Sequence, residues 1–305
     1  MWVYYGFDWR RELPRILAAD WRWIFLAVIF DWVVYICQGL RWTALLSPLG
    51  RISVWKSTQA IYIGLFANEI LPLRSGEVIR CYLQRRWTGL PLSVIVSSVL
   101  VERLWDGVWL ITAFSLVASR VELPGFLQVM SRGLLIMLAI LMSALGAAML
   151  YRKRTEEAVA ASRWARRLRP VMDGLYTMGR SRSFWWAGFL SFCYLALQIV
   201  PLYALLRGYR LELSPWAALV MLVIVRLGTV IPQAPGNMGS FQALIVAGLG
   251  IFGYSKADAA GFATLSFFVV TVPLLFGGFV ALMLTRMRLG DIRREAQASL
   301  ADDDD

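Results

Sequence analysis

The chain has 305 residues, of which 59% are hydrophobic and only 17% charged, and its mean hydropathy is +0.60. Soluble proteins approach a quarter charged residues, so this composition excludes an ordinary soluble enzyme and indicates an integral membrane protein. The sequence contains no histidine, which removes Ser-His-Asp and Cys-His catalysis and the usual zinc ligand sets. The net charge of +11 lies beside apolar stretches, which favours contact with anionic lipid headgroups over nucleic acid.

Apolar stretches follow one another along the whole chain. In chain order they are Trp23–Leu46, Val54–Leu71, Pro91–Ser119, Gly133–Tyr151, Ser183–Leu206, Leu213–Ile231, Phe241–Phe252 and Ala259–Thr285. Most of them approach or exceed the ~20 residues that a helix needs to cross the hydrocarbon core. Isolated charges, among them Asp31, Arg41 and Arg226, interrupt some of them. Since lipid satisfies no backbone groups, the sequence predicts an all-α, polytopic helical bundle.

A basic segment divides the chain into two membrane halves. We expect residues 1–151 to form the first half, 152–182 a basic loop, 183–288 the second half and 289–305 a tail. The positive-inside rule predicts that the loop and the C-terminus are cytoplasmic. Apolar residues recur at helical spacing within the loop, which is typical of an amphipathic interfacial helix, although a solvated basic linker explains its charge equally well. Charge alone does not orient the N-terminus, which either lies outside or forms a short cytoplasmic interfacial helix.

The two halves share a weak internal repeat. Trp55 lies 17 residues before Pro72, and Trp216 lies 16 residues before Pro232, each pair closing an apolar run with proline and glycine. Such paired interruptions point to a transporter-like site built from broken, re-entrant hairpins. Coincidence is the rival explanation, because glycine and proline are common in membrane helices.

The first candidate site surrounds the interruption near Pro72. It comprises two carboxylates, two arginines, an amide and a glycine, namely Asn68, Glu69, Arg74, Gly76, Glu77 and Arg80. A short helix beginning near Ser75 would offer unpaired N–H groups, and the arginines would supply bidentate donors for a phosphate. The alternative is a cytoplasmic loop whose arginines follow the positive-inside rule.

The second candidate site lies inside an apolar stretch. Glu102, Arg103 and Asp106 occupy the middle of Pro91–Ser119, where an ionisable residue costs about 2.5–3.5 kcal/mol and normally faces a partner or a wet cavity. An Arg103–Asp106 pair could be purely structural, but Glu102 would then still lack a partner.

The third candidate site surrounds the second interruption. Its members are Arg226, Gln233, Gly236, Asn237, Gly239 and Gln242. The glycines would let backbone amides point toward an anion, whereas the alternative is a tight turn between helices. None of the three sites has a recognised catalytic, metal or nucleotide motif, so we expect no cofactor and no catalytic residue, and an enzyme is the less favoured class.

The three blocks together resemble the flippase-like membrane domain found as the transmembrane region of lysylphosphatidylglycerol synthases, also called UPF0104. Asn68, Pro72, Arg74, Gly76-Glu77, Arg80, Glu102-Arg103 and Asp106 match its first-half pattern, and Pro235-Gly236 and Gly239 its second. Asn237 and Gln242 depart from it, since the family commonly has glycine and glutamate there. The resemblance implies a bacterial or archaeal cell-membrane protein that moves or accommodates lipid, without the soluble domain that transfers lysine.

Three functions are compatible with these features. The favoured one is a lipid translocase or lipid-binding transporter for an anionic phospholipid or a lipid-linked phosphate. The second is a membrane-embedded transferase acting on a polyprenyl-phosphate lipid, with Glu77 or Glu102 as general base. The third is a noncatalytic scaffold whose basic loop recruits a partner.

Overall fold

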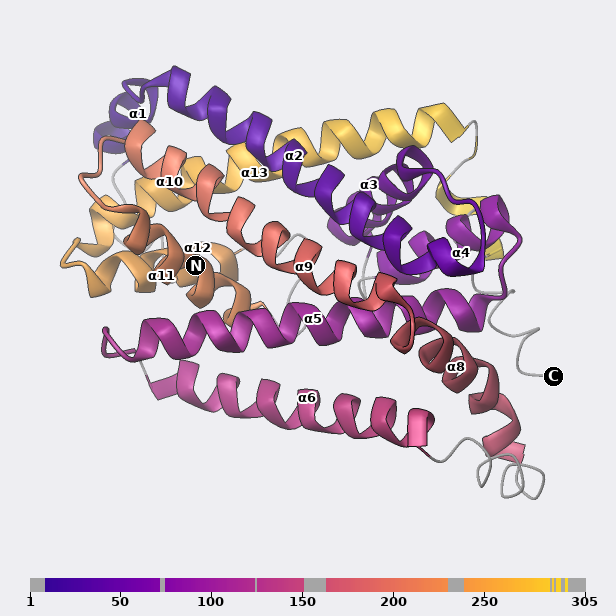
Figure 1. Cartoon of the computed structure of the whole chain (residues 1–305). Coiled ribbons are helices and arrows are strands. Elements are labelled where there is room, and N and C mark those ends of the chain that lie inside the picture. The colour runs from indigo at the N-terminus through magenta and orange to yellow at the C-terminus, as the bar shows by residue number, and fades with distance from the viewer. Residues whose placement is uncertain are drawn as a thin grey trace.

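A computed structural model of the chain describes residues 9–71, 75–123, 125–150, 163–229, 239–285, 287, 289–291, 294 and 295. This part of the chain is α-helical and contains no strand (Figure 1). Its main helices are α1 (Trp9–Leu17), α2 (Trp21–Leu46), α3 (Val54–Ile70), α4 (Gly76–Thr88), α5 (Leu92–Ala118), α6 (Gly125–Leu150), α8 (Arg163–Gly179), α9 (Arg182–Leu197), α10 (Ile199–Gly208), α11 (Pro215–Gly228), α12 (Ser240–Ile251) and α13 (Lys256–Thr285). The predicted all-α, polytopic membrane bundle is confirmed.

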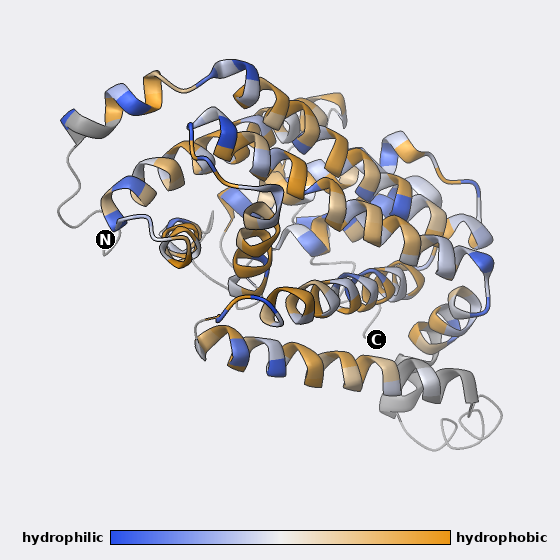
Figure 2. Ribbon diagram, turned by 60° about the vertical axis from the view of Figure 1, so that its left-hand side comes forward, coloured by the Kyte–Doolittle hydropathy of each residue, from blue (hydrophilic) through white to orange (hydrophobic). Residues whose placement is uncertain are grey.

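Four stretches are long and apolar enough to cross a membrane. They are Trp21–Leu49, Gly125–Ser143, Arg182–Gly208 and Lys256–Thr285. Helix α5 has a comparable length of 27 residues, but it carries the charges of the second candidate site. Large apolar side chains such as Phe25, Ile140 and Phe276 are exposed along these helices, which suits a lipid environment. Figure 2 shows hydrophobic ribbon along the long helices and hydrophilic segments in their connections.

Two pairs of short helices pack as hairpins within the bundle. Helices α3 and α4 touch through glycines, because a Cβ on Gly76 would lie 1.8 Å from the Gly64 carbonyl oxygen. Helices α11 and α12 are similarly close, since a Cβ on Gly228 would lie 2.3 Å from Cδ2 of Leu244. With 12 to 17 residues each, these helices are shorter than a full span.

The two hairpins lie at opposite ends of the bundle. One core cluster joins α11 and α12 to the beginning of α2, through Ile24, and to the beginning of α13, through Phe262. Another joins α3 and α4 to the end of α2, through Trp42, and to the end of α13, through Leu282. Figure 1 shows the same separation, with α11 and α12 at one end and α3 and α4 at the other.

The two halves therefore repeat with inverted direction. The order long helix, hairpin, long helix is α2, α3–α4, α5 in the first half and α9–α10, α11–α12, α13 in the second. The packing follows the same exchange, because α3 packs on α13 and α11 packs on α5. Inverted repeats with interrupted helices are an architecture that secondary transporters share.

Helices α1 and α8 cap the two ends. Arg15 of α1 forms an ion pair of 2.6 Å with Asp258 at the beginning of α13. At the other end α8 packs on α5, where the Ser97 hydroxyl donates to the Val171 carbonyl over 2.8 Å and Leu175 and Met178 are buried. The end of the basic segment is thus a helix packed on the bundle.

Candidate functional site

The centre of the site is Glu102, which is 1% exposed in the middle of α5. Nε of Arg41, from α2, donates to one carboxylate oxygen over 3.2 Å. Nη2 of Arg80, from α4, donates to the other oxygen over 3.1 Å. Glu102, which has no partner in its own helix, is therefore bound from two other helices.

Glu102 belongs to a closed ring of three arginines and three carboxylates. Arg80 also donates to Glu77 over 2.8 Å, and Nη2 of Arg103 donates to the second oxygen of Glu77 over 2.7 Å. Arg41 also binds Asp106, and Nη1 of Arg103 lies 3.6 Å from Asp106, which closes the ring. The predicted Arg103–Asp106 contact exists, but it is the longest ion pair of the ring.

The ring explains how so many charges are tolerated in an apolar bundle. Each charge faces two of opposite sign, so the ring is neutral as a whole, whereas a lone buried ion would pay its full desolvation cost. Aromatic side chains add further support, since the guanidinium of Arg80 lies 4.9 Å from the Trp42 ring and that of Arg41 4.9 Å from the Tyr194 ring. Arg41 additionally donates to the Ser191 hydroxyl over 3.0 Å.

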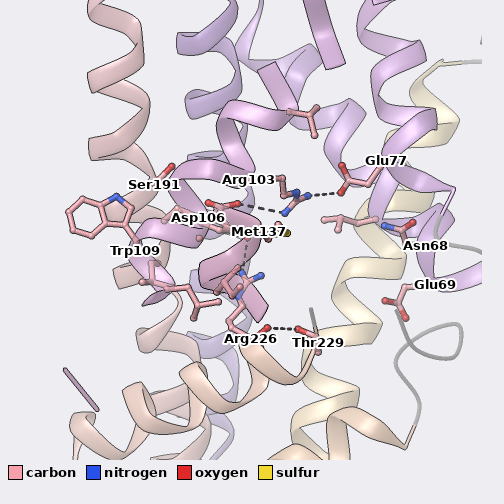
Figure 3. A pocket seen from close by; sticks show the side chains of 17 residues that line it. Asn68, Glu69, Glu77, Arg103, Asp106, Trp109, Met137, Ser191, Arg226 and Thr229 are labelled. Atoms are coloured by element: carbon pink, nitrogen blue, oxygen red, sulfur yellow. Dashed lines mark hydrogen bonds and ion pairs between the residues drawn. The ribbon is translucent and has the colours of Figure 1, made fainter. Parts of the chain in front are cut away.

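One side of the ring faces a cavity of about 580 Å³. The cavity lies between the two hairpins and is lined from α3, α4, α5, α6, α9 and α11, with Thr229 after the end of α11. Figure 3 shows Arg103 between Asp106 and Glu77, with Asn68 and Glu69 on one side of the view and Trp109 and Ser191 on the other. Its lining also includes the apolar side chains Leu65, Val99, Leu110, Leu134, Met137 and Leu195. The cavity therefore combines charged, polar and apolar side chains in its lining.

Two arginines present positive charge to this cavity. The Arg103 side chain is 45% exposed, in contrast to the buried Arg41 and Arg80. Arg226, near the end of α11, donates through Nε to the Gln198 amide oxygen over 2.7 Å and through Nη2 to the Tyr194 hydroxyl over 2.8 Å. Within the described chain no carboxylate lies at ion-pair distance from Arg226. This guanidinium is therefore held by neutral acceptors beside the cavity.

The structure brings most of the first and second predicted sites together. Asn68 lines the cavity, and its side-chain oxygen accepts the Gly76 N–H over 2.8 Å, which holds the beginning of α4 against α3. Glu69 also lines the cavity. Of the third site, only Arg226 is among the lining residues. The residues that lie outside the described part of the chain are Arg74, Gln233, Gly236 and Asn237.

Gly239 and Gln242, the other described residues of the third site, lie at a helix end. The Gln242 side chain accepts the Gly239 N–H over 2.7 Å and caps α12. Gly239 has φ of 85°, a left-handed conformation that favours glycine. This amide is therefore already bound, so it does not contribute an open N–H to the predicted anion nest.

Sequence reasoning did not assign Arg41, Tyr194 and Gln198 to the site. Arg41 had a visible signal, because it is a lone charge within an apolar stretch and such residues need a partner. Tyr194 and Gln198 carry no charge and lie in a stretch without ionised residues, so nothing in the pattern distinguished them.

The carboxylates of the ring are poorly placed for acid–base chemistry. Glu77 and Glu102 each accept hydrogen bonds from two arginines. Such contacts occupy the oxygens that a general base would use. This arrangement holds α2, α4 and α5 together.

The fold and the site define a polytopic membrane protein whose inverted halves enclose a cavity lined by charged and apolar side chains. The family model described as the lysylphosphatidylglycerol synthase TM region matches residues 1–278, and the chain belongs to this family. It is 26% identical over 283 residues to a UPF0104 membrane protein of Methanothermobacter thermautotrophicus, covering 86% of this chain and 84% of that protein. It is 27% identical over 107 residues to a UPF0104 membrane protein of Methanocaldococcus jannaschii, covering 34% of this chain and 31% of that protein. No solved structure matches the chain.

Proposed function

We propose that the protein binds an anionic phospholipid or a lipid-linked phosphate in the central cavity and moves it between leaflets. The observation that carries the proposal is the mixed lining of the cavity, in which the guanidiniums of Arg103 and Arg226 occur together with aliphatic side chains. An amphipathic lipid likewise combines a charged headgroup with apolar chains. The volume of about 580 Å³ falls within the usual range for small-ligand sites and suits a headgroup with the first part of its chains.

Guanidinium donors at the site suit an anion. The ring is internally neutral, and the lining adds the carboxylate of Glu69 and the guanidinium of Arg226, which no described carboxylate pairs with directly. Guanidinium groups bind phosphate through two parallel hydrogen bonds, and such charge-assisted bonds contribute about 1.5–3 kcal/mol each. A phosphate between Arg103 and Arg226 would meet donors from both repeats.

Binding at Arg103 would also act on the hairpin. Arg103 ties α5 to the beginning of α4 through Glu77, and both side chains are partly exposed at 45% and 42%. A headgroup phosphate competes with Glu77 for the same guanidinium. Ligand entry would therefore loosen α4 from α5 at this contact. On the buried side, Arg80 would still bind both Glu77 and Glu102.

The distribution of basic residues suggests the orientation in the membrane. Helix α8, which belongs to the basic segment 152–182, lies at the end of the bundle that holds α3 and α4. The positive-inside rule makes that end cytoplasmic. Hairpin α3–α4 would then enter from the cytoplasm, and hairpin α11–α12 and helix α1 would lie on the outer side. This orientation favours the external N-terminus over a cytoplasmic interfacial helix.

The experiment that tests this function follows lipid location and lipid chemistry together. Purified protein is reconstituted into vesicles that contain a trace of fluorescent phosphatidylglycerol, fluorescent polyprenyl phosphate or fluorescent neutral diacylglycerol. A membrane-impermeant quencher then reports how fast each probe changes leaflet, and mass spectrometry reports its headgroup. We expect faster exchange of an anionic probe with an unchanged headgroup. A changed headgroup would indicate a transferase, and no effect on any probe would indicate the scaffold.

A further inference from the structure

Asp31 is a buried carboxylate that the proposed function does not use. It lies in the middle of α2 and is 9% exposed. Its Oδ2 is buried, and no donor of the described chain reaches it. A carboxylate in such a place lacks the hydrogen bonds that normally offset desolvation, so its ionised form depends on a nearby cation.

The nearest polar groups come from three helices besides its own. Tyr35 follows Asp31 by one turn of α2, and its ring packs edge-on against Tyr62 of α3 with centroids 5.2 Å apart. Asp31 interacts electrostatically with Arg226 of α11, and Tyr35 interacts with both of them and with Tyr194 of α9.

The other helices that pack on α2 contribute no further counter-charge. Glu102 and Asp106 of α5 are bound to Arg41, and Asp106 also interacts electrostatically with Arg226. Tyr203 of α10 lies near the beginning of α2, where its ring packs against Trp23. From residue 259 to residue 285, α13 contains no ionisable side chain. Arg226 is thus the cation on which the charge of Asp31 depends.

Arg226 connects Asp31 with the cavity. Arg226 lines the cavity together with Thr229 and Tyr194, and it is also the electrostatic partner of Asp31. An anionic headgroup at Arg226 would use the same positive charge that favours the ionised form of Asp31. Two anions cannot both be compensated by one guanidinium in an apolar bundle, so one of them must be neutralised.

From this arrangement, and given the proposed function, we infer that Asp31 is a proton-binding site that takes up one proton when an anionic lipid headgroup occupies the cavity at Arg226. The step converts a carboxylate and a free proton into a carboxylic acid, and no other bond changes. A carrier that moves both together transports one proton with each singly charged headgroup, which is an electrically neutral process. A proton gradient, rather than the membrane potential, would then drive lipid movement in the direction of proton flow.

Calorimetric titration in two buffers of different ionisation enthalpy counts the protons that binding takes up. The protein in detergent is titrated with short-chain phosphatidylglycerol between pH 6 and pH 8. We expect one proton per bound lipid and, in the range where Asp31 changes state, an apparent Kd that falls about tenfold for each pH unit of acidification. The variants are Asp31→Asn, which fixes the neutral form, and Glu122→Gln, an exposed carboxylate between α5 and α6, as the matched control.

The outcomes separate the inference from the proposed function. Asp31→Asn should bind with no proton uptake and no pH dependence, as tightly as the wild type at low pH, while Glu122→Gln should behave as the wild type. Lipid binding without proton uptake in the wild type, or unchanged uptake in Asp31→Asn, overturns the inference and leaves the proposed function intact. No binding of the anionic probe by a monodisperse wild-type protein overturns both.

Discussion

Replacing Glu102 by glutamine tests whether the charged ring holds the bundle together. The substitution keeps the shape of the side chain but removes the charge that Arg41 and Arg80 share at 3.2 and 3.1 Å. Both guanidiniums are almost fully buried, at 1% and 3% exposure, so the ring is left with one uncompensated positive charge. Removing one partner of a buried ion pair costs about 3–5 kcal/mol, and we expect a loss of this size in the free energy of unfolding.

The assay is reversible unfolding in mixed micelles, followed by tryptophan fluorescence. The double variant Glu102→Gln/Arg80→Gln restores neutrality, because Arg41 keeps Asp106 and Glu77 keeps Arg103. We therefore expect it to recover about half of the lost stability, which a double-mutant cycle measures as a coupling between the two positions. The ring does not stabilise the fold as argued if the free energy of unfolding of Glu102→Gln stays within about 1 kcal/mol of the wild type. The same conclusion follows if the double variant is less stable than Glu102→Gln alone.

Three further predictions concern packing, surface charge and orientation. Gly76→Ala places a Cβ 1.8 Å from the Gly64 carbonyl oxygen and should lower the free energy of unfolding by about 1–3 kcal/mol. The control Gly133→Ala, with open space around it in α6, should be neutral or slightly stabilising. Equal effects of the two substitutions in thermal unfolding would contradict the close packing of α3 on α4. Glu295→Ala removes a surface ion pair with Arg86 in which both side chains are about half exposed, and the same unfolding assay should show a change below about 1 kcal/mol. Single cysteines are introduced at positions 51 and 122 in a chain whose Cys37, Cys81 and Cys193 are replaced by alanine. An impermeant maleimide should label position 51 from the cytoplasm and position 122 from outside. Labelling of both positions from one side would contradict the inverted repeat.

Much of the fold could be predicted because the hydrophobic pattern is set by the membrane. The interval between helices α3 and α4 follows from Pro72 and Gly76, and the predicted start of a short helix near Ser75 is confirmed by α4 at Gly76. Helix α6 begins at Gly125, earlier than the uncharged stretch from Gly133, because Arg132 is exposed and does not interrupt it. The inverted direction of the repeat could not be predicted, since it depends on which helices pack together.

The candidate site was only partly visible in the sequence. Glu102, Arg103 and Asp106 were conspicuous because ionised residues are rare within apolar stretches. Their partners were not, because Arg41 and Arg80 are 61 and 22 residues away from Glu102 along the chain, and nothing within one helix indicates such pairs. The closed ring is a property of the tertiary structure, as is the placement of Arg226 beside the same cavity.

The most direct test of the proposed lipid site is the leaflet-exchange rate of fluorescent phosphatidylglycerol in vesicles containing Arg226→Gln, compared with Arg51→Gln as a control. Arg226 lines the cavity, whereas Arg51 is exposed in the connection between α2 and α3. Losing a charge-assisted contact of about 1.5–3 kcal/mol should slow protein-dependent exchange about tenfold or more in Arg226→Gln and leave Arg51→Gln at the wild-type rate. Equal rates in all three proteins would contradict the assignment of the cavity as the path of the lipid headgroup.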